Sequence, residues 1–266
     1  MGEFSNPESY ELWMGRWSAR LAPAFVNFAD LPNGGRFLDV GSGTGVLAAA
    51  IVAAIEDAKV IGVEPGAAYI AYCQAHLRDD RLSFEQGDAL DIPFADEQFN
   101  AALSLLILQE LTDAPKAIRE MRRVTQGGGC VAASQWNFKG GMPMLALFWD
   151  AVIDTIGTQS AREAAADCMA VNYPDEKALR YLWEDAGLVE VEAELQEIEM
   201  AFNSFDDYWA SFLTGVTPTS SYTQKLSPDQ KIALKERLWE KTIGRGSDHP
   251  FTLAAQAWAV RGLVPS

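Results

Sequence analysis

The sequence has few of the residues that build disulfide-bonded or metal-bound proteins. Among its 266 residues only three are cysteine and two are histidine. The cysteines, Cys73, Cys130 and Cys168, are odd in number and far apart, so neither a disulfide framework nor a cysteine-rich zinc site is offered. A reducing compartment fits this pattern. We expect no bound metal, because histidine is so scarce.

Long apolar runs are also missing. No stretch reaches the ~18 to 20 residues that a membrane span needs. The chain starts MGEFSNPESYE, which contains no apolar segment of signal-peptide length. These absences predict a cytoplasmic protein that has no membrane partner.

Basic residues are outnumbered by acidic ones. Lys and Arg total 21 against 37 Asp and Glu, a formal net charge of −16. Such a charge repels phosphate backbones and anionic surfaces, so a nucleic-acid partner is not expected. The same balance also serves solubility alone. It gives no information on fold or oligomeric state.

Hydrophobic residues make up 48% of the chain, enough for a large core. From Arg36 to Trp136, short β-rich apolar runs alternate with helix-length segments, which is typical of parallel βαβ units. The expected strands are 36–40, 59–64, 81–88, 99–108 and 129–136. The expected helices are 46–56, 67–77 and 115–124, and the glycines at 127–129 should turn the chain into the fifth strand.

After Trp136 the pattern changes, because two glycines lead into an aromatic and Met-rich helix that belongs to no βαβ unit. The segments expected here are helices 143–156, 175–186, 204–215 and 227–243 and strands 188–202 and 251–260. The fold class is α/β: a Rossmann-like, seven-stranded, mostly parallel sheet with an antiparallel last strand, helices on both faces and helical lid insertions. We expect a single domain, 1–266, with a binding core at 34–138. The insertions are 1–33, 139–172 and 203–249, and segments 173–202 and 250–262 complete the sheet.

A glycine-rich loop, Asp39-Val-Gly41-Ser42-Gly43-Thr-Gly45, lies directly between the first strand and its helix. Glycines let the chain turn tightly and let a ligand approach the backbone, while the helix start offers free N–H groups. A dinucleotide loop reads G-x-G-x-x-G, but here the third glycine comes one residue early. No Lys-Ser or Lys-Thr follows, so nucleotide phosphates are not the expected ligand.

Acidic residues end three successive strands. Asp39 would oppose a pyrophosphate but attract a cationic ammonium group. Glu64 can accept hydrogen bonds from both hydroxyls of a ribose. Asp88 can accept a hydrogen bond from the exocyclic amine of adenine, with Ala89 beside the ring. A simpler interpretation also stands, in which the glycines form an ordinary turn and Asp88 is a turn residue.

These residues resemble those of class I methyltransferases that use S-adenosylmethionine (SAM), of the small-molecule type that includes ubiquinone and menaquinone methyltransferases. Over residues 34–138 the family motif VLDVGCGTG is matched by FLDVGSGTG, with Ser42 in place of the common Cys. The resemblance implies SAM as the cofactor and Asp39, Gly41, Gly43, Glu64 and Asp88 as its contacts. The further contacts expected at the same strand ends are Ser42, Pro65, Ala89, Ser104 and Leu105.

The segment 10–32 resembles the leading helices of such enzymes, which close over the cofactor and would bring Tyr10 and Arg16 to it. The aromatic side chains that would line a substrate pocket are Trp17, Trp136, Phe148, Tyr208 and Trp209, although aromatics at helical spacing are as often core residues. No catalytic residue is identified, because direct methyl displacement needs alignment more than a base. Neither His76 nor His249 is a compelling base.

The fourth strand runs into Ser104-Leu105-Leu106-Ile107, where relatives that methylate DNA or glutamine carry Asn-Pro-Pro-Tyr or a similar tetrad. We therefore expect the methyl acceptor to be a small apolar or aromatic molecule. Two other functions stay open. One is a SAM-binding module without catalysis, and the other is a nicotinamide-dependent oxidoreductase, which the glycine spacing disfavours.

Overall fold

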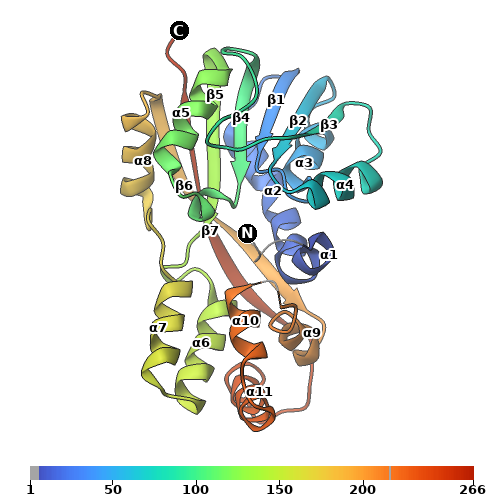
Figure 1. Ribbon diagram of the computed structural model, residues 1–266, viewed down its shortest axis with the longest axis vertical. Helices are drawn as coiled ribbons and strands as arrows, with labels where there is room; N and C mark the ends of the chain where they lie inside the picture. The colour runs from blue at the N-terminus through green and yellow to red at the C-terminus, as the bar shows by residue number, and fades with distance from the viewer. Residues whose placement is uncertain (1–5, 216) are drawn as a thin grey trace. The chain divides into compact units, whose positions relative to one another are not determined.

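A seven-stranded sheet organises the computed structural model, which describes residues 6–215 and 217–266. Its strand order is β3-β2-β1-β4-β5-β7-β6 (Figure 1). The strands are β1 (Gly35–Val40), β2 (Ala58–Glu64), β3 (Leu82–Gln86), β4 (Phe99–Leu105), β5 (Thr125–Trp136), β6 (Val189–Phe202) and β7 (Phe251–Leu263). Strands β1 to β5 pair in parallel, whereas β7 pairs antiparallel with β5. The predicted fold class is confirmed.

Helices connect and flank these strands. They are α1 (Pro7–Tyr10), α2 (Arg16–Ala29), α3 (Val46–Ala54), α4 (Ala67–His76), α5 (Ala114–Val124), α6 (Pro143–Thr155), α7 (Gln159–Cys168), α8 (Glu176–Asp185), α9 (Phe205–Ala210), α10 (Pro218–Gln224) and α11 (Pro228–Thr242). A π-helical turn, Glu11–Gly15, joins α1 to α2, and a 3₁₀ turn, Leu108–Glu110, follows β4. No helix in the described part of the chain combines the length and hydropathy that a membrane crossing requires.

The described residues form two compact units. One, the sheet unit, comprises residues 15–136, 172–196 and 257–266. The other, the helical unit, comprises the described residues of 1–14, 137–171 and 197–256. Strands β6 and β7 contribute residues to both units. The expectation of a single domain with helical insertions stays a prediction.

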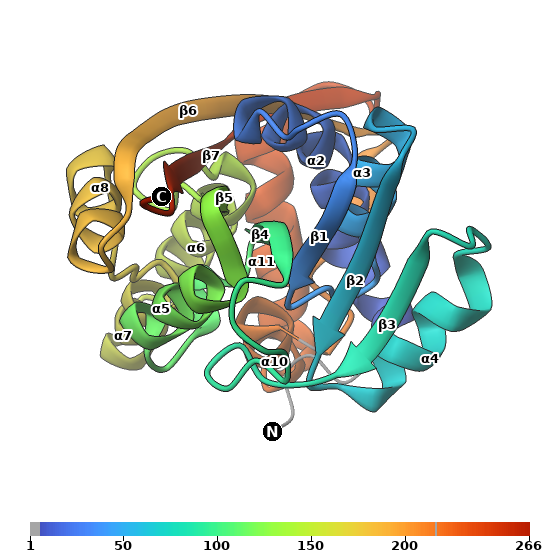
Figure 2. The ribbon, with the colours of Figure 1, turned by 90° about the horizontal axis from the view of Figure 1, so that it is seen from above.

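Apolar side chains cover both faces of the sheet unit. On one face Phe25 of α2 and Ile51 of α3 pack with Phe37 and Ala101 of the sheet. On the other face Ile118 of α5 and Leu182 of α8 belong to a second buried cluster. Figure 2 shows these two helix pairs on opposite sides of the strands. Burial of both faces explains why the strands read as nearly continuous apolar runs.

The helix α5 illustrates how local sequence sets an element. Asp113 accepts a hydrogen bond from the N–H of Lys116 at 2.9 Å, which caps the helix start. Its apolar residues Ile118, Met121 and Val124 recur at helical spacing and are buried. The charged residues Glu120 and Arg123 of the same helix contact the segment that precedes β4.

The start of the fifth strand differs from the prediction. Strand β5 begins at Thr125, so the glycines at 127–129 lie inside it. The register shifts where Phe99 pairs with Thr125 but Ala101 pairs with Cys130, which marks a bulge. The N–H of Gly128, at a φ of +75°, donates to the carbonyl of Val264 at 2.8 Å. Pairing with the last residues of the chain therefore extends the strand through a segment that looks like a turn.

In the helical unit, two helices were missed and one is shorter than predicted. Helices α7 and α10 directly follow Thr158 and Thr217, which cap them through their side chains. The predicted helix 204–215 ends at Ala210 in α9. Beyond it the N–H groups of residues 211, 212 and 213 donate to carbonyls three positions earlier, so the chain continues as tight turns.

Candidate functional site

The glycine loop turns the chain between β1 and α3. Gly41, Gly43 and Gly45 have φ values of +72°, +50° and +81°, which side-chain-bearing residues rarely adopt. A Cβ on Gly41 would lie 2.6 Å from the Cδ1 of Ile107, and one on Gly45 would lie 3.1 Å from the Sγ of Cys73. A Cβ on Gly43 would meet nothing within 4 Å. The loop is therefore packed at both ends and bare at its centre.

Hydrogen bonds hold this loop in place. The N–H groups of Gly41 and Ser42 donate to the carbonyl of Val63 at 2.8 and 3.1 Å. The Cys73 thiol of α4 donates to the carbonyl of Gly43 at 3.2 Å. The Ser42 hydroxyl is buried and has no partner among the described residues. A loop fixed in this way is preorganised, so a ligand binding there would not have to order it.

Asp39, at the end of β1, is buried, with 1% of its surface exposed. Its Oδ2 accepts a hydrogen bond from the N–H of Ala48 in α3 at 3.1 Å. Burial raises the pKa of Asp39 from 3.8 to about 7, the Ala48 hydrogen bond lowers it, and the nearby charge of Glu64 raises it. A cation beside this carboxyl would favour its ionised form.

Glu64 ends β2 and joins two loops. Its Oε2 accepts the N–H of Gly43 at 3.1 Å, and its Oε1 accepts the N–H of Gly66 at 2.9 Å. Burial raises the pKa of this half-buried carboxyl, and the two backbone hydrogen bonds lower it. The next residue, Pro65, is exposed, and its carbonyl accepts a hydrogen bond from Gln86 at 3.2 Å. Glu64 thus organises the glycine loop, a role that its position in the sequence does not reveal.

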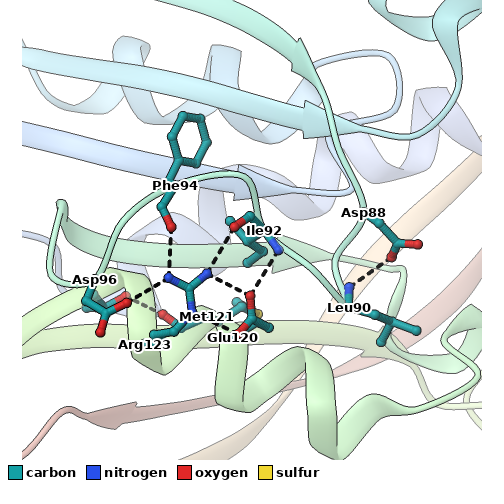
Figure 3. A network of polar contacts seen from close by, with 9 residues as sticks. Asp88, Leu90, Ile92, Phe94, Asp96, Glu120, Met121 and Arg123 are labelled. Carbon is teal, nitrogen blue, oxygen red and sulfur yellow. Dashed lines mark hydrogen bonds and ion pairs between the residues drawn. The ribbon is translucent and has the colours of Figure 1, made fainter.

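Asp88 lies two residues beyond β3 and is exposed. Its Oδ1 accepts the N–H of Leu90 at 2.8 Å (Figure 3). Its carbonyl accepts the N–H of Asp91 at 3.0 Å. The adjacent Ala89 is buried. The turn that the sequence offered as the simpler interpretation is therefore present. One carboxylate oxygen of Asp88 has no hydrogen bond within this turn, and its role toward adenine stays a prediction.

The end of β4 is strained. The predicted strand runs to residue 108, but β4 ends at Leu105, because Leu106 has a φ of +64°. The N–H of Leu106 donates to the carbonyl of Ser134 at 2.8 Å. The hydroxyl of Ser104 is buried without a partner among the described residues, and Leu105 is half-buried. A left-handed residue with a side chain is uncommon and is found often at binding sites.

Four further residues were predicted to contact the cofactor or the substrate: Arg16, Trp17 and Trp136 in the sheet unit, and Tyr10 in the helical unit. The guanidinium of Arg16 lies 4.4 Å from the ring centroid of Trp17 at the start of α2. Trp17 is buried, as is Trp136 at the end of β5. In the helical unit, Tyr10 meets Trp13 edge to face, with ring centroids 6.5 Å apart. Contact of these four predicted residues with a ligand stays a prediction.

The aromatic residues predicted for the substrate pocket in the helical unit form much of its core. Phe148 stacks on Phe212 with ring centroids 4.4 Å apart. Tyr208 is fully buried, and its hydroxyl donates to the carbonyl of Met144 at 2.7 Å. Trp209 is buried beside them. These contacts are those of an aromatic core, the alternative that the sequence left open, and a substrate role for these residues stays a prediction.

Histidine and metal-ligating groups are dispersed. Both His76 and His249 are exposed. In the described part of the chain, the Nδ1 of each ring hydrogen-bonds to a nearby backbone carbonyl, that of Tyr72 for His76 and that of Ser247 for His249. Within residues 6–215 and 217–266, no three His, Cys, Asp or Glu side chains gather closely enough to hold a metal ion. The chemistry of the site therefore depends on the carboxylates and the glycine loop.

The sequence from Leu38 to Ala133 matches the profile of a family described as a methyltransferase domain. The matched segment includes the end of β1, the glycine loop, Glu64, Asp88, all of α5 and most of β5. The sequence resemblance is confirmed for this segment.

Two curated relatives that match this segment are named as quinone methyltransferases. A demethylmenaquinone methyltransferase of Roseiflexus sp. is 39% identical over 107 residues, 40% of this chain and 45% of the relative. A 2-phytyl-1,4-naphtoquinone methyltransferase of Thermosynechococcus vestitus is 34% identical over 111 residues, 40% of this chain and 48% of the relative. The chain thus spans somewhat less than half the length of these relatives.

The fold is shared with solved methyltransferases. A phosphoethanolamine N-methyltransferase 2 of Haemonchus contortus, solved with phosphomonomethylethanolamine and S-adenosylhomocysteine, superposes with a TM-score of 0.60 at 15% identity. The match covers 98% of this chain and 57% of that one. At this identity the likeness concerns the fold alone.

Proposed function

We propose that this protein transfers a methyl group from SAM to a small apolar or aromatic molecule. The observation that carries the proposal is the bare centre of the glycine loop. Gly43 leaves open space where a Cβ would stand. The carboxyl of Glu64 accepts the N–H of Gly43, and that of Asp39 accepts the N–H of Ala48 just after the loop. A cationic amino acid joined to an uncharged nucleoside fits such a site better than a phosphate does.

The residues present can be assigned to parts of SAM. Asp39 would hold the ammonium group, Glu64 the ribose hydroxyls and Asp88 the adenine amine, with the backbone of Gly41 and Gly43 alongside. Bound SAM supplies a methyl group on a sulfonium, an electrophile that needs no metal. The chain's part is to orient the cofactor and exclude water, because direct displacement depends on alignment.

The acceptor class rests on two supports. The relatives named above methylate naphthoquinone-type molecules by name, and the sequence after β4 lacks the Asn-Pro-Pro-Tyr tetrad. We extend the proposal to a cytoplasmic location and to a chain without a nucleic-acid partner, both on the sequence composition.

Calorimetric titration with S-adenosylhomocysteine and with NAD⁺ tests the cofactor. We expect binding of the first and not of the second, and the reverse result would refute the proposal in favour of an oxidoreductase. A second assay follows S-adenosylhomocysteine formation from SAM with a panel of quinols, phenols and amines. Turnover of an apolar aromatic member is expected. Tight SAM binding without any product would support a module that binds SAM but does not catalyse.

A further inference from the structure

The segment 87–98 connects β3 to β4 and carries Asp88 and Ala89 at its start. It contains neither helix nor strand, so its own backbone does not fix its path. Loops of this length without internal structure need contacts from elsewhere to be ordered. Those contacts come from two charged residues of α5, Glu120 and Arg123.

Arg123 binds the loop through two of its nitrogens, Nη1 and Nη2 (Figure 3). Its Nη1 donates to the carbonyl of Phe94 at 2.8 Å and to Asp96 at 2.9 Å, and its Nη2 donates to the carbonyl of Ile92 at 3.0 Å. Its Nε and Nη2 also donate to the two carboxylate oxygens of Glu120, at 2.8 and 2.7 Å. The guanidinium plane thus joins the loop backbone to the helix.

Glu120 completes the attachment. Its Oε2 accepts the N–H of Ile92 at 3.0 Å, so both backbone groups of that residue are bound. The main chain of Arg123 adds a contact, since its carbonyl accepts the N–H of Glu97 at 3.0 Å. The side-chain hydrogen bond from Arg123 lowers the pKa of Glu120, which keeps this carboxylate ionised near neutral pH.

The attachment continues to Asp88 through a short stretch of chain. Ile92 is buried, and Asp91 pairs with Asp88 in an isolated antiparallel bridge. The backbone from Asp91 to Ile92 therefore links the fixed part of the loop directly to the turn that presents Asp88. Displacement of Ile92 would move the exposed carboxylate that ends this turn.

We propose that Glu120 and Arg123 are positioning residues that set the place of Asp88, and with it the selectivity of the site for an adenine base. The inference rests on the proposed function, because it assigns Asp88 to the adenine amine. Neither positioning residue touches the ligand. Their effect is exerted through the backbone of residues 91–97.

Arg123→Lys tests this role. Lysine keeps the charge but has one nitrogen, which cannot serve four acceptors at once. Arg81→Lys is a matched control, because Arg81 likewise binds an acid, Asp79, and the carbonyls of Ile55 and Glu56 in the same unit, but at the start of β3. Both variants lose comparable hydrogen bonds, but only Arg123 binds the loop that carries Asp88.

Two measurements are made on each protein: hydrogen exchange of residues 87–98, and the affinities for S-adenosylhomocysteine and its inosine analogue, which has a carbonyl in place of the adenine amine. The wild type should prefer the adenine compound by about tenfold, the effect of one charge-assisted hydrogen bond. In Arg123→Lys, exchange in the loop should rise and the preference should fall below about threefold. Arg81→Lys should keep the preference.

Loss of selectivity equal in both variants, or an unchanged preference in Arg123→Lys, would overturn the inference while leaving SAM binding intact. Failure of the wild type to bind either compound would instead refute the proposed function together with this inference. Should Arg123→Lys not fold, Glu120→Gln replaces it, since one amide oxygen cannot accept all three hydrogen bonds that the two carboxylate oxygens accept, and the amide NH2 would face an N–H donor. The same fall in preference is expected there.

Discussion

Asp39 is predicted to lower the stability of the free protein. The pKa of this buried carboxyl rises from 3.8 to about 7, chiefly because burial penalises the charged form. The folded state therefore binds a proton more tightly than the unfolded chain does. Stability is lost as the pH rises from the unfolded pKa to the folded one, and the loss is complete above about pH 7.

The magnitude follows from the pKa difference of about 3 units, from 3.8 to about 7. At ~1.36 kcal/mol per unit, ionised Asp39 lowers the free energy of unfolding by about 4 kcal/mol at pH 8 and by about 2 kcal/mol at pH 5. Asp39→Asn removes the charge but keeps an oxygen to accept the N–H of Ala48. We expect the variant to be more stable by those amounts.

Urea denaturation of the free protein at both pH values measures the effect, with Asp88→Asn as an exposed control that should change little. The affinity for SAM should fall at least about tenfold in Asp39→Asn, because the ammonium group of SAM loses its charged partner. In the wild type this affinity should rise with pH up to about 7, as Asp39 ionises. A gain in stability that is equal at both pH values, or a variant less stable at pH 8, would refute the reasoning.

Four other substitutions separate binding from packing. Gly41→Ala should lower the free energy of unfolding by about 1–3 kcal/mol in urea titrations, because its φ is +72° and its Cβ would lack room. Gly43→Ala, with space for a Cβ, should cost less than Gly41→Ala but weaken S-adenosylhomocysteine binding in calorimetry, and equal losses of stability would contradict this. Ser42→Ala removes a buried hydroxyl without a described partner, so its unfolding free energy should stay level or rise by about 1 kcal/mol. Tyr208→Phe removes a 2.7 Å hydrogen bond and should lower stability by ~1 kcal/mol while sparing turnover, whereas lost turnover in a folded variant would indicate substrate contact.

Local patterns in the chain predicted most of the sheet unit. The apolar runs of β1 and β2, and the capped helix α5, have bounds within two residues of those expected. The glycine loop was recognised for the same reason. Its spacing, and its place between a strand and a helix, are properties of neighbouring residues that no distant contact has to supply.

Distant contacts decided the rest. Strand β5 extends through three glycines because residue 264 pairs with residue 128, and β4 ends early at a left-handed Leu106 bound to residue 134. Helices α7 and α10 were missed because their apolar faces are weak in sequence and gain their burial from the surrounding helices.

The sequence by itself determined that three carboxylates lie at or just beyond the ends of successive strands, because strand order and residue type are written along the chain. Only the tertiary structure decided what each carboxylate does in the free protein. Asp39 is desolvated, Glu64 joins two loops across 21 residues of sequence, and the loop that follows Asp88 is bound by the guanidinium of Arg123 from α5. Burial and hydrogen bonding depend on segments that meet only when the chain folds, and these set the charge and position of each group.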